Sequence, residues 1–229
     1  MSENPLEDQA PVGSYSFRPP VGSDTLIDHA ADRSNASAQH TILVGELHHR
    51  LQNTLSIVLA LSRLTARTVD TVDEFQVAFG QRIEAMARTN ALLLRGQVQA
   101  VSVQTALETE LQPYLDDNGQ VTLICDPLKV SSAAALSLSL IFHELATNAA
   151  KYGALAKPSG RLVVECRASA LGGVLHWRES VVAPLAPSVR EGSGSLLISR
   201  LARGLGGTSR IELLPGGLEA EITFRLDEA

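Results

Sequence analysis

A histidine and an acidic residue stand three positions apart in the segment ELHHRLQN, which runs from Glu46 to Asn53. Residues three or four positions apart share one face of a helix, so Glu46, His49 and Asn53 would form one polar stripe. A neutral imidazole is a good nucleophile near neutral pH, and a carboxylate one turn away can hold its tautomer and accept its proton. We therefore predict that His49 faces water and attacks phosphorus, with Glu46 as its base. An ordinary solvated helix face with a charge pair is the alternative interpretation.

Polar side chains also interrupt an otherwise apolar helical pattern in the segment HELATNAAKYGAL, from His143 to Leu155. The amide oxygen of Asn148 can bind Mg²⁺, a hard cation that prefers oxygen ligands and usually bridges to nucleotide phosphates. Glu144, one turn earlier, could hold a metal-bound water or orient the reacting groups, and Lys151 could neutralise phosphate charge. The pattern predicts a cleft for a magnesium nucleotide, and a structured polar core is the other interpretation.

Two amphipathic helices are expected within residues 39–98, which we assign to a dimerisation and phosphotransfer hairpin. The first extends from Ile42 to about Arg67, and the second begins at Thr71, which forms a capping-box pattern with Glu74. A lone hairpin leaves an apolar stripe on each helix, so we predict that two copies associate into a four-helix bundle. Residues 1–38 hold four of the ten prolines and little apolar periodicity, which predicts a flexible tail.

Residues 99–229 alternate between helical and strand patterns and are predicted to form one catalytic, ATP-binding-like domain. We expect three helices against five strands, with consecutive strands antiparallel, in an α/β two-layer sandwich. The fold class is therefore α+β, a helical hairpin followed by this sandwich. The expected helices are 102–114, 131–152 and 195–205, and the expected strands are 121–125, 161–168, 174–180, 208–214 and 218–226.

The order of four motifs resembles that of the HWE-type sensor histidine kinases, from residue 43 to the C-terminus. The motifs are Glu-x-x-His-Arg-x-x-Asn at 46–53, the helix with His143 and Asn148, LHWRES with Trp177 and Glu179, and the glycine box with Gly192 and Gly194. In the family the histidine directly precedes arginine, which selects His49 over His48. The resemblance implies an ATP-binding domain of the type shared with gyrase and Hsp90.

The same resemblance implies roles for individual residues of the second domain. Asn148 would bind Mg²⁺, Glu179 would contact the amino group of adenine, and Gly192 and Gly194 would let the lid backbone approach the phosphates. Glycine suits a lid of this kind because it lacks a Cβ. The chain departs from the family after Trp-x-Glu, where Val181 and Val182 replace glycines, and we expect these two side chains to narrow the adenine pocket.

The resulting hypothesis is a cytoplasmic kinase that phosphorylates His49 from Mg²⁺·ATP and passes the phosphoryl group to the aspartate of a response-regulator receiver domain. The signal would come from a separate sensor protein. One alternative is a histidine phosphotransferase or response-regulator phosphatase that uses His49 or Asn53 without ATP. The other alternative is a noncatalytic adaptor that binds a regulator through the helical bundle.

Composition excludes other classes of function. A net charge of −6 and a pI near 5.5 disfavour a nucleic-acid binder, which would show a basic stripe. No apolar run is long enough for membrane insertion. Cys125 and Cys166 fall in separate predicted strands without a CxxC spacing, so a metal site or a disulfide is not expected, and both are interpreted as small buried hydrophobes.

Overall fold

The computed structural model describes residues 45, 48, 51–96, 100–115, 119–182 and 193–226. The chain divides into two compact units, Met1–His49 and Arg50–Ala229, and the second unit contains almost all of the described residues. The predicted tail lies outside the described residues. The boundaries expected at residues 38 and 98 stay predictions.

Two helices open the second unit, as the periodicity predicted. Residues 51–66 are helical, and α2 extends over Val72–Gly96. The capping box at the start of α2 is present, since the Glu74 N–H donates to Thr71 Oγ1 at 3.2 Å and the Thr71 N–H donates to Glu74 Oε2 at 3.3 Å. Leu61, Leu64 and Met86 are buried between these helices and the rest of the unit, so the hairpin is part of a continuous packed structure.

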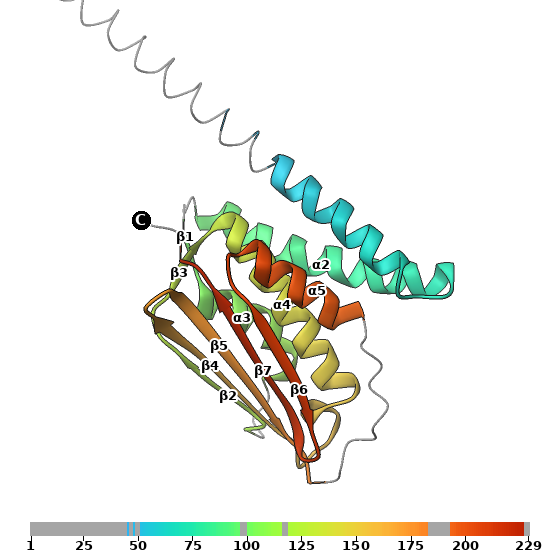
Figure 1. Cartoon of the computed structure of the whole chain (residues 1–229), viewed down its shortest axis with the longest axis vertical. Helices are drawn as coiled ribbons and strands as arrows, with labels where there is room; N and C mark the ends of the chain where they lie inside the picture. The colour runs from blue at the N-terminus through green and yellow to red at the C-terminus, as the bar shows by residue number, and fades with distance from the viewer. Residues whose placement is uncertain are drawn as a thin grey trace, which may run out of the picture. The chain divides into compact units, whose positions relative to one another are not determined.

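A five-stranded sheet forms one layer of the remaining chain (Figure 1). Its strand order is β2-β4-β5-β7-β6, with β2 at Val121–Cys125, β4 at Arg161–Ser169, β5 at Gly172–Ser180, β6 at Ser209–Leu214 and β7 at Gly217–Phe224. The expectation that consecutive strands are all antiparallel was wrong for β2 and β4, which pair in parallel. A helix crosses over between these two strands, and such a crossover returns the chain in the same direction. A short antiparallel pair, β1 (Ala100–Ser102) with β3 (Lys129–Ser131), was not predicted.

Helices α3, α4 and α5 pack against the sheet, as expected (Figure 1). Their bounds are Val103–Leu111 for α3, which is followed by a 3-10 turn at Gln112–Tyr114, Ser132–Lys151 for α4 and Ser193–Gly204 for α5; a second 3-10 turn follows α4 at Ala154–Ala156. The most apolar helix, α4, lies at the centre of the core and buries Phe142 against a sheet that buries Trp177 and Phe224. Ser131 caps α4 by accepting the N–H of Ala134.

Two glycines end α5. Gly206 has a φ of 69°, in the left-handed region that favours glycine. The Gly206 N–H donates to Arg203 O at 3.0 Å and the Gly207 N–H donates to Ala202 O at 2.9 Å, which together make a Schellman motif. This cap ends α5 and returns the chain to β6.

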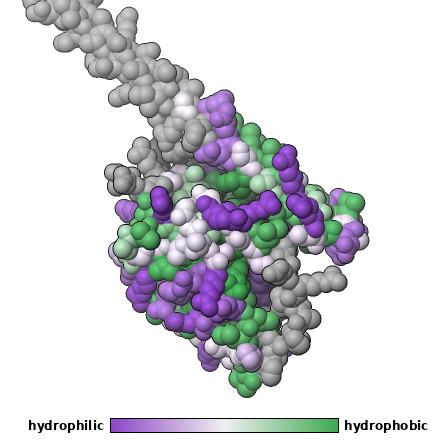
Figure 2. Space-filling view, in the orientation of Figure 1, coloured by the Kyte–Doolittle hydropathy of each residue, from purple (hydrophilic) through white to green (hydrophobic). Residues whose placement is uncertain are grey.

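The outer face of the sheet is charged and solvated. Arg178 and Arg167 both bind Glu165, and Arg167 also reaches Asp126 at 3.3 Å. Hydrophilic residues colour much of the surface over these strands in Figure 2. None of the described helices combines the length and the apolar character that a bilayer crossing requires.

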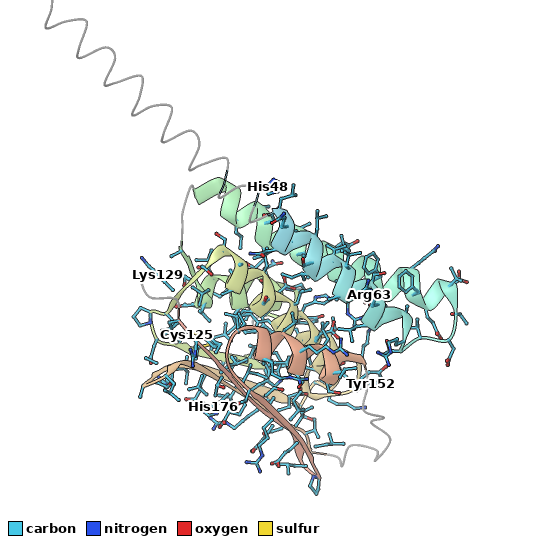
Figure 3. All side chains as sticks on the ribbon, turned by 45° about the horizontal axis from the view of Figure 1, so that its top comes forward. His48, Arg63, Cys125, Lys129, Tyr152 and His176 are labelled. Atoms are coloured by element: carbon cyan, nitrogen blue, oxygen red, sulfur yellow. The ribbon has the colours of Figure 1, made fainter. Side chains whose placement is uncertain are left out.

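The two cysteines are closer than the sequence suggested. Cys125 and Cys166 are register partners on the neighbouring parallel strands β2 and β4, and both are free thiols. Cys166 is fully buried, as expected, but Cys125 is only half-buried because β2 is an edge strand. Figure 3 shows Cys125 and His176 on the sheet and Tyr152 at the end of α4.

Candidate nucleotide site

Three predicted site residues, Glu46, His49 and Gly192, lie outside the described residues, so their roles stay predictions. Of the same helical stripe, Asn53 is described and is half-buried in the helix of residues 51–66. His48, the histidine not selected, is helical and exposed. The residues described below for the nucleotide site all belong to the second unit.

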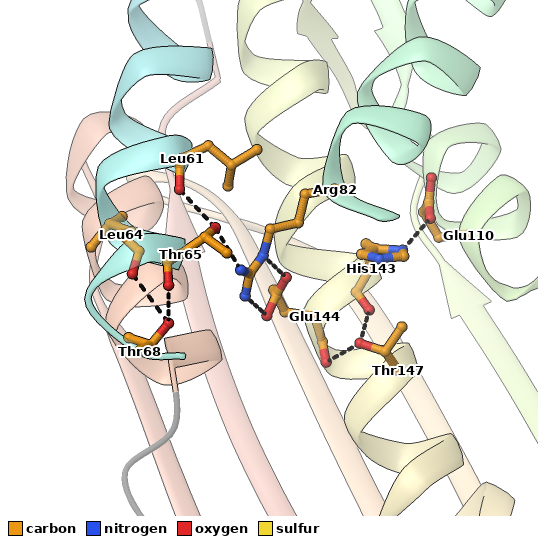
Figure 4. A network of polar contacts seen from close by, with 9 residues as sticks. All are labelled: Leu61, Leu64, Thr65, Thr68, Arg82, Glu110, His143, Glu144 and Thr147. Atoms are coloured by element: carbon orange, nitrogen blue, oxygen red, sulfur yellow. Dashed lines mark hydrogen bonds and ion pairs between the residues drawn. The ribbon is translucent and has the colours of Figure 1, made fainter. Parts of the chain in front are cut away.

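Helix α4 presents its polar side chains in more than one direction. His143 points toward α3, whereas Glu144 points toward α2 (Figure 4). Asn148, one turn after Glu144, is half-buried, and Lys151 is exposed in the last turn. Successive helical residues are separated by about 100°, so adjacent polar positions in the sequence need not serve one site.

The first turn of α5 lies beside Glu144 and Asn148. A Cβ added at Gly194 would lie 2.9 Å from Glu144 Oε2 and 3.4 Å from Asn148 Nδ2. Gly194 is buried, so only a residue without a side chain lets this backbone approach so closely. Three of the predicted residues are thus brought together as the sequence suggested. The amide and carboxylate oxygens suit Mg²⁺, and a helix N-terminus suits phosphate.

Glu144 forms a buried ion pair that the sequence did not reveal. Arg82 of α2 donates through Nε to Oε1 at 2.7 Å and through Nη2 to Oε2 at 2.8 Å. The two side chains are only 6% and 8% exposed. Arg82 Nη1 also donates to Thr65 Oγ1 at 2.9 Å, and Thr65 donates to the carbonyl of Leu61 (Figure 4). Both oxygens of the predicted catalytic carboxylate are therefore engaged by the hairpin.

His143 belongs to a second polar cluster on the other side of α4. Its Nδ1 lies 3.2 Å from Glu110 Oε2, which also accepts from Arg88 Nη2 at 2.7 Å. Burial raises the pKa of Glu110, but the hydrogen bonds from His143 and Arg88 outweigh it and hold that pKa below 4.5. The histidine that the resemblance singled out is therefore tied to α3 and α2, not directed at Asn148.

Glu179, the predicted adenine-binding residue, lies near the end of β5 and is 5% exposed. Its Oε2 accepts the N–H of Ala154 at 2.8 Å and its Oε1 accepts Trp177 Nε1 at 3.0 Å. Burial raises the pKa of Glu179 above its usual 4.5, although both hydrogen bonds act in the opposite direction. Each carboxylate oxygen has two acceptor sites, so one more donor such as an adenine amino group can still be bound.

The loop after the Trp-x-Glu segment does not obstruct this region in the way that was expected. Val182 is 85% exposed, so its side chain does not narrow the pocket as expected. Val181 is half-buried, and its N–H donates to Gly216 O at 2.8 Å. The backbone there continues the sheet hydrogen bonding past the end of β5, which turns Val182 toward solvent.

Sequence reasoning missed the two arginines and the buried acid that hold α4. Arg82 and Glu110 carry a signal in the sequence, which is a charged residue at an apolar helical position. Arg82 lies between Phe79, Ile83 and Met86, and Glu110 lies between the buried Leu107 and Leu111. Charged side chains in such positions are almost always paired when they are buried, so each predicts a partner on a neighbouring element.

Comparison with known proteins agrees with these features. The model of a family described as HWE histidine kinase matches residues 46–126, which include the Glu46–Asn53 motif. The recognition made from the four motifs is thereby confirmed.

Curated histidine kinases resemble this chain over most of its length. The chain is 28% identical over 205 residues to Blue-light-activated histidine kinase 1 of Erythrobacter litoralis, covering 87% of this chain and 57% of that protein. It is 27% identical over 203 residues to the blue-light-activated histidine kinase of Brucella ovis, covering 86% of this chain and 42% of that protein. The chain thus spans about half the length of the curated relatives it matches.

The solved histidine kinase domain of the Erythrobacter litoralis EL346 blue-light activated histidine kinase has the same fold. It superimposes with a TM-score of 0.54 at 13% identity, covering 76% of this chain and 94% of that domain. The predicted fold class, a helical region followed by the five-stranded sandwich of histidine kinases, is confirmed.

Proposed function

We propose that this chain is the kinase core of a two-component histidine kinase that phosphorylates itself on His49 from Mg²⁺·ATP. The observation that carries the proposal is the meeting of Glu144, Asn148 and the first turn of α5 at Gly194. Oxygen ligands and a helix N-terminus at one place suit a magnesium-bound phosphate chain. The match to the HWE histidine kinase family supports the same assignment.

Each residue of the site has a distinct role in this proposal. Asn148 would hold Mg²⁺, which when bound neutralises phosphate charge, and Glu179 would accept a hydrogen bond from the adenine amino group. The α5 backbone at Gly194 and the exposed Lys151 would face the phosphates. The His49 imidazole attacks the γ-phosphorus, ADP leaves, and Glu46 takes the imidazole proton. A receiver-domain aspartate then accepts the phosphoryl group.

Incubation with γ-labelled ATP and Mg²⁺ tests the proposal. We expect acid-labile, alkali-stable label that is lost in His49→Ala and in Asn148→Ala. His48→Ala is the matched control, because it removes the adjacent histidine, and it should retain the label. Label that persists in His49→Ala would contradict the assignment of the nucleophile.

A second candidate is a histidine phosphotransferase or response-regulator phosphatase that does not use ATP. It is favoured by Val181, a branched, half-buried residue where the family has a glycine. This activity would give no label from ATP, but the protein would rapidly acquire phosphoryl from a phosphorylated receiver domain. Absence of both reactions would leave the noncatalytic adaptor.

We also propose that the chain acts as a homodimer. Leu51, Leu55 and Leu59 recur every four residues on the first helix and are 54%, 53% and 58% exposed. Leucines at this spacing form one continuous stripe, which a second copy of the hairpin can cover. We expect Leu55→Glu to shift the mass measured by light scattering from dimer to monomer. Ser56→Glu places the same charge on the adjacent face and should preserve the dimer.

A further inference from the structure

The clamp formed by Arg82, Thr65 and Glu144 joins three elements that the proposed reaction needs to move. Thr65 belongs to the first helix of the hairpin, Arg82 to α2, and Glu144 to α4. Arg82 is 5% exposed and Thr65 is fully buried, so water does not compete for these contacts. The carboxylate is bound in a bidentate manner, with each oxygen accepting one N–H of the guanidinium.

Other contacts between α2 and α4 are also partly polar. Thr89 Oγ1 of α2 donates to Ser139 Oγ of α4 at 2.5 Å, and both side chains are buried. Around them Ala85 and Met86 pack against Leu140. A buried ion pair recovers little net stability once its desolvation is counted, but removal of one partner leaves an uncompensated buried charge. This interface can therefore open at little cost when the freed carboxylate gains another cationic partner.

The clamp conflicts with the role expected of Glu144 in the nucleotide site. Gly194 places the α5 backbone directly beside Glu144 Oε2, the oxygen that Arg82 Nη2 holds at 2.8 Å. A guanidinium there neutralises the carboxylate and puts a positive charge where the magnesium ion of the nucleotide complex would bring another. Like charges at such distances repel strongly in a dry site. Arg82 and a magnesium ion would thus compete for one carboxylate.

We propose that Arg82 is a positioning residue, which withholds Glu144 from the magnesium nucleotide while α2 is packed against α4 and releases it when the hairpin moves. The inference rests on the proposed function, because it assigns Glu144 to the nucleotide site. Coupling of this kind is reciprocal. If packing of α2 against α4 lowers the affinity for a nucleotide that needs Glu144, then binding of that nucleotide disfavours the packing by the same factor. The position of the hairpin and the occupancy of the nucleotide site are therefore coupled.

Calorimetry with Mg²⁺·ADP tests the clamp without requiring phosphoryl transfer. If the clamped state is favoured about tenfold, Arg82→Met should lower the Kd by about tenfold, since it removes that population. Arg82→Lys keeps the charge but loses the bidentate geometry, and should give an intermediate value. Arg88→Met is the matched control on the same helix, because it frees Glu110 instead, and should leave the Kd within about twofold of the wild type. An unchanged or raised Kd in Arg82→Met would overturn the proposal.

A reversible lock provides a second measurement that does not depend on how well Arg82→Met folds. Thr89→Cys combined with Ser139→Cys, with both native cysteines replaced by alanine, should form a disulfide, because the two hydroxyl oxygens are only 2.5 Å apart. The oxidised protein should bind Mg²⁺·ADP more weakly than the reduced protein, and reductant should restore binding. Equal affinity of the two forms would refute the proposal.

The two proposals fail in different ways. Tighter Mg²⁺·ADP binding in Arg82→Met with no label on His49 in any variant would support the clamp and contradict the kinase. Normal labelling of His49 with the same Kd in Arg82→Met and in the wild type would support the kinase and contradict the clamp. A failure of every variant, wild type included, to bind Mg²⁺·ADP would overturn both.

Discussion

Replacement of Glu179 by glutamine tests two properties of its carboxylate. One is its role in supporting the proposed adenine site, and the other is its raised pKa. The carboxylate accepts two N–H donors, one at each oxygen, from Ala154 and from Trp177. Glutamine has one carbonyl oxygen, and its amide nitrogen would face the other donor. One buried N–H therefore loses its acceptor in Glu179→Gln.

The expected size of the effect follows from that lost acceptor. A buried donor left unsatisfied costs about 1–3 kcal/mol, and in a chain of this size each kcal/mol lowers the Tm by about 2–4 °C. With about 2 kcal/mol as the central value, the Tm of Glu179→Gln should fall by about 4–8 °C. Mg²⁺·ADP binding should weaken as well, because an amide oxygen is a poorer acceptor than a carboxylate.

The stability difference between wild type and Glu179→Gln should depend on pH in one direction. The pKa of Glu179 is raised in the folded state above 4.5, so the folded protein binds the proton more tightly than the unfolded chain. The stability that this proton confers is present below pH 4.5 and is lost as the pH rises through the folded pKa. Glutamine does not titrate. The stability difference between wild type and Glu179→Gln should therefore be largest at low pH and shrink as the pH rises.

Urea denaturation across this pH range measures the difference. Glu219→Gln on neighbouring β7 is the matched control, because Glu219 is exposed, and its stability should stay within about 0.5 kcal/mol of the wild type. A difference for Glu179→Gln that grows with rising pH would refute the assignment of a raised pKa. A difference no larger than that of Glu219→Gln would refute the structural role.

Three further predictions concern local stability and thiol reactivity. Thr71→Ala removes the capping oxygen of α2 and should cost about 1 kcal/mol in urea denaturation. Gly206→Ala forces a Cβ into a left-handed backbone at φ 69° and should cost about 1–2 kcal/mol, whereas Gly216→Ala, with open space around it, should cost less. The hydrogen bond between the thiols lowers the pKa of Cys125 and, with burial, raises that of Cys166. Iodoacetamide at about pH 8 should therefore modify Cys125 first, as peptide mass spectrometry would show; preferential modification of Cys166 would contradict this.

Most of the fold could be predicted because local signals and burial agree along this chain. The strand at Val121–Cys125 and the helix between Ser131 and Tyr152 were placed almost to the residue, since apolar periodicity and caps coincide there. The short pair β1 and β3 was missed because three-residue strands have no periodicity to detect. The parallel pairing of β2 with β4 was missed because it depends on the crossover through α4, which is a long-range feature.

The site was predictable only where residue type and motif order define it. Gly194, Glu144 and Asn148 were correctly grouped, because a glycine lid must approach the polar helix. The partners of that helix were not predicted, since Arg82 and Glu144 are 62 positions apart in the chain. A charged residue at a buried helical position predicts a partner of opposite charge, but periodicity does not indicate which element supplies that partner.

The directions of the polar side chains on α4 explain why one helix can join two functions. His143 binds Glu110 of α3, which also binds Arg88 of α2. Glu144 binds Arg82 of α2, while Asn148 lies beside α5. A shift of α2 cannot leave both carboxylates in place, because its two arginines are bound to acids on two different helices. If Arg82 withholds Glu144 as we propose, movement of the hairpin frees this acid, which lies one turn before Asn148, ahead of any phosphoryl transfer. Glu144 would then belong both to the hairpin's docking contacts and to the proposed nucleotide site, so a signal that moves the hairpin would act directly on that site.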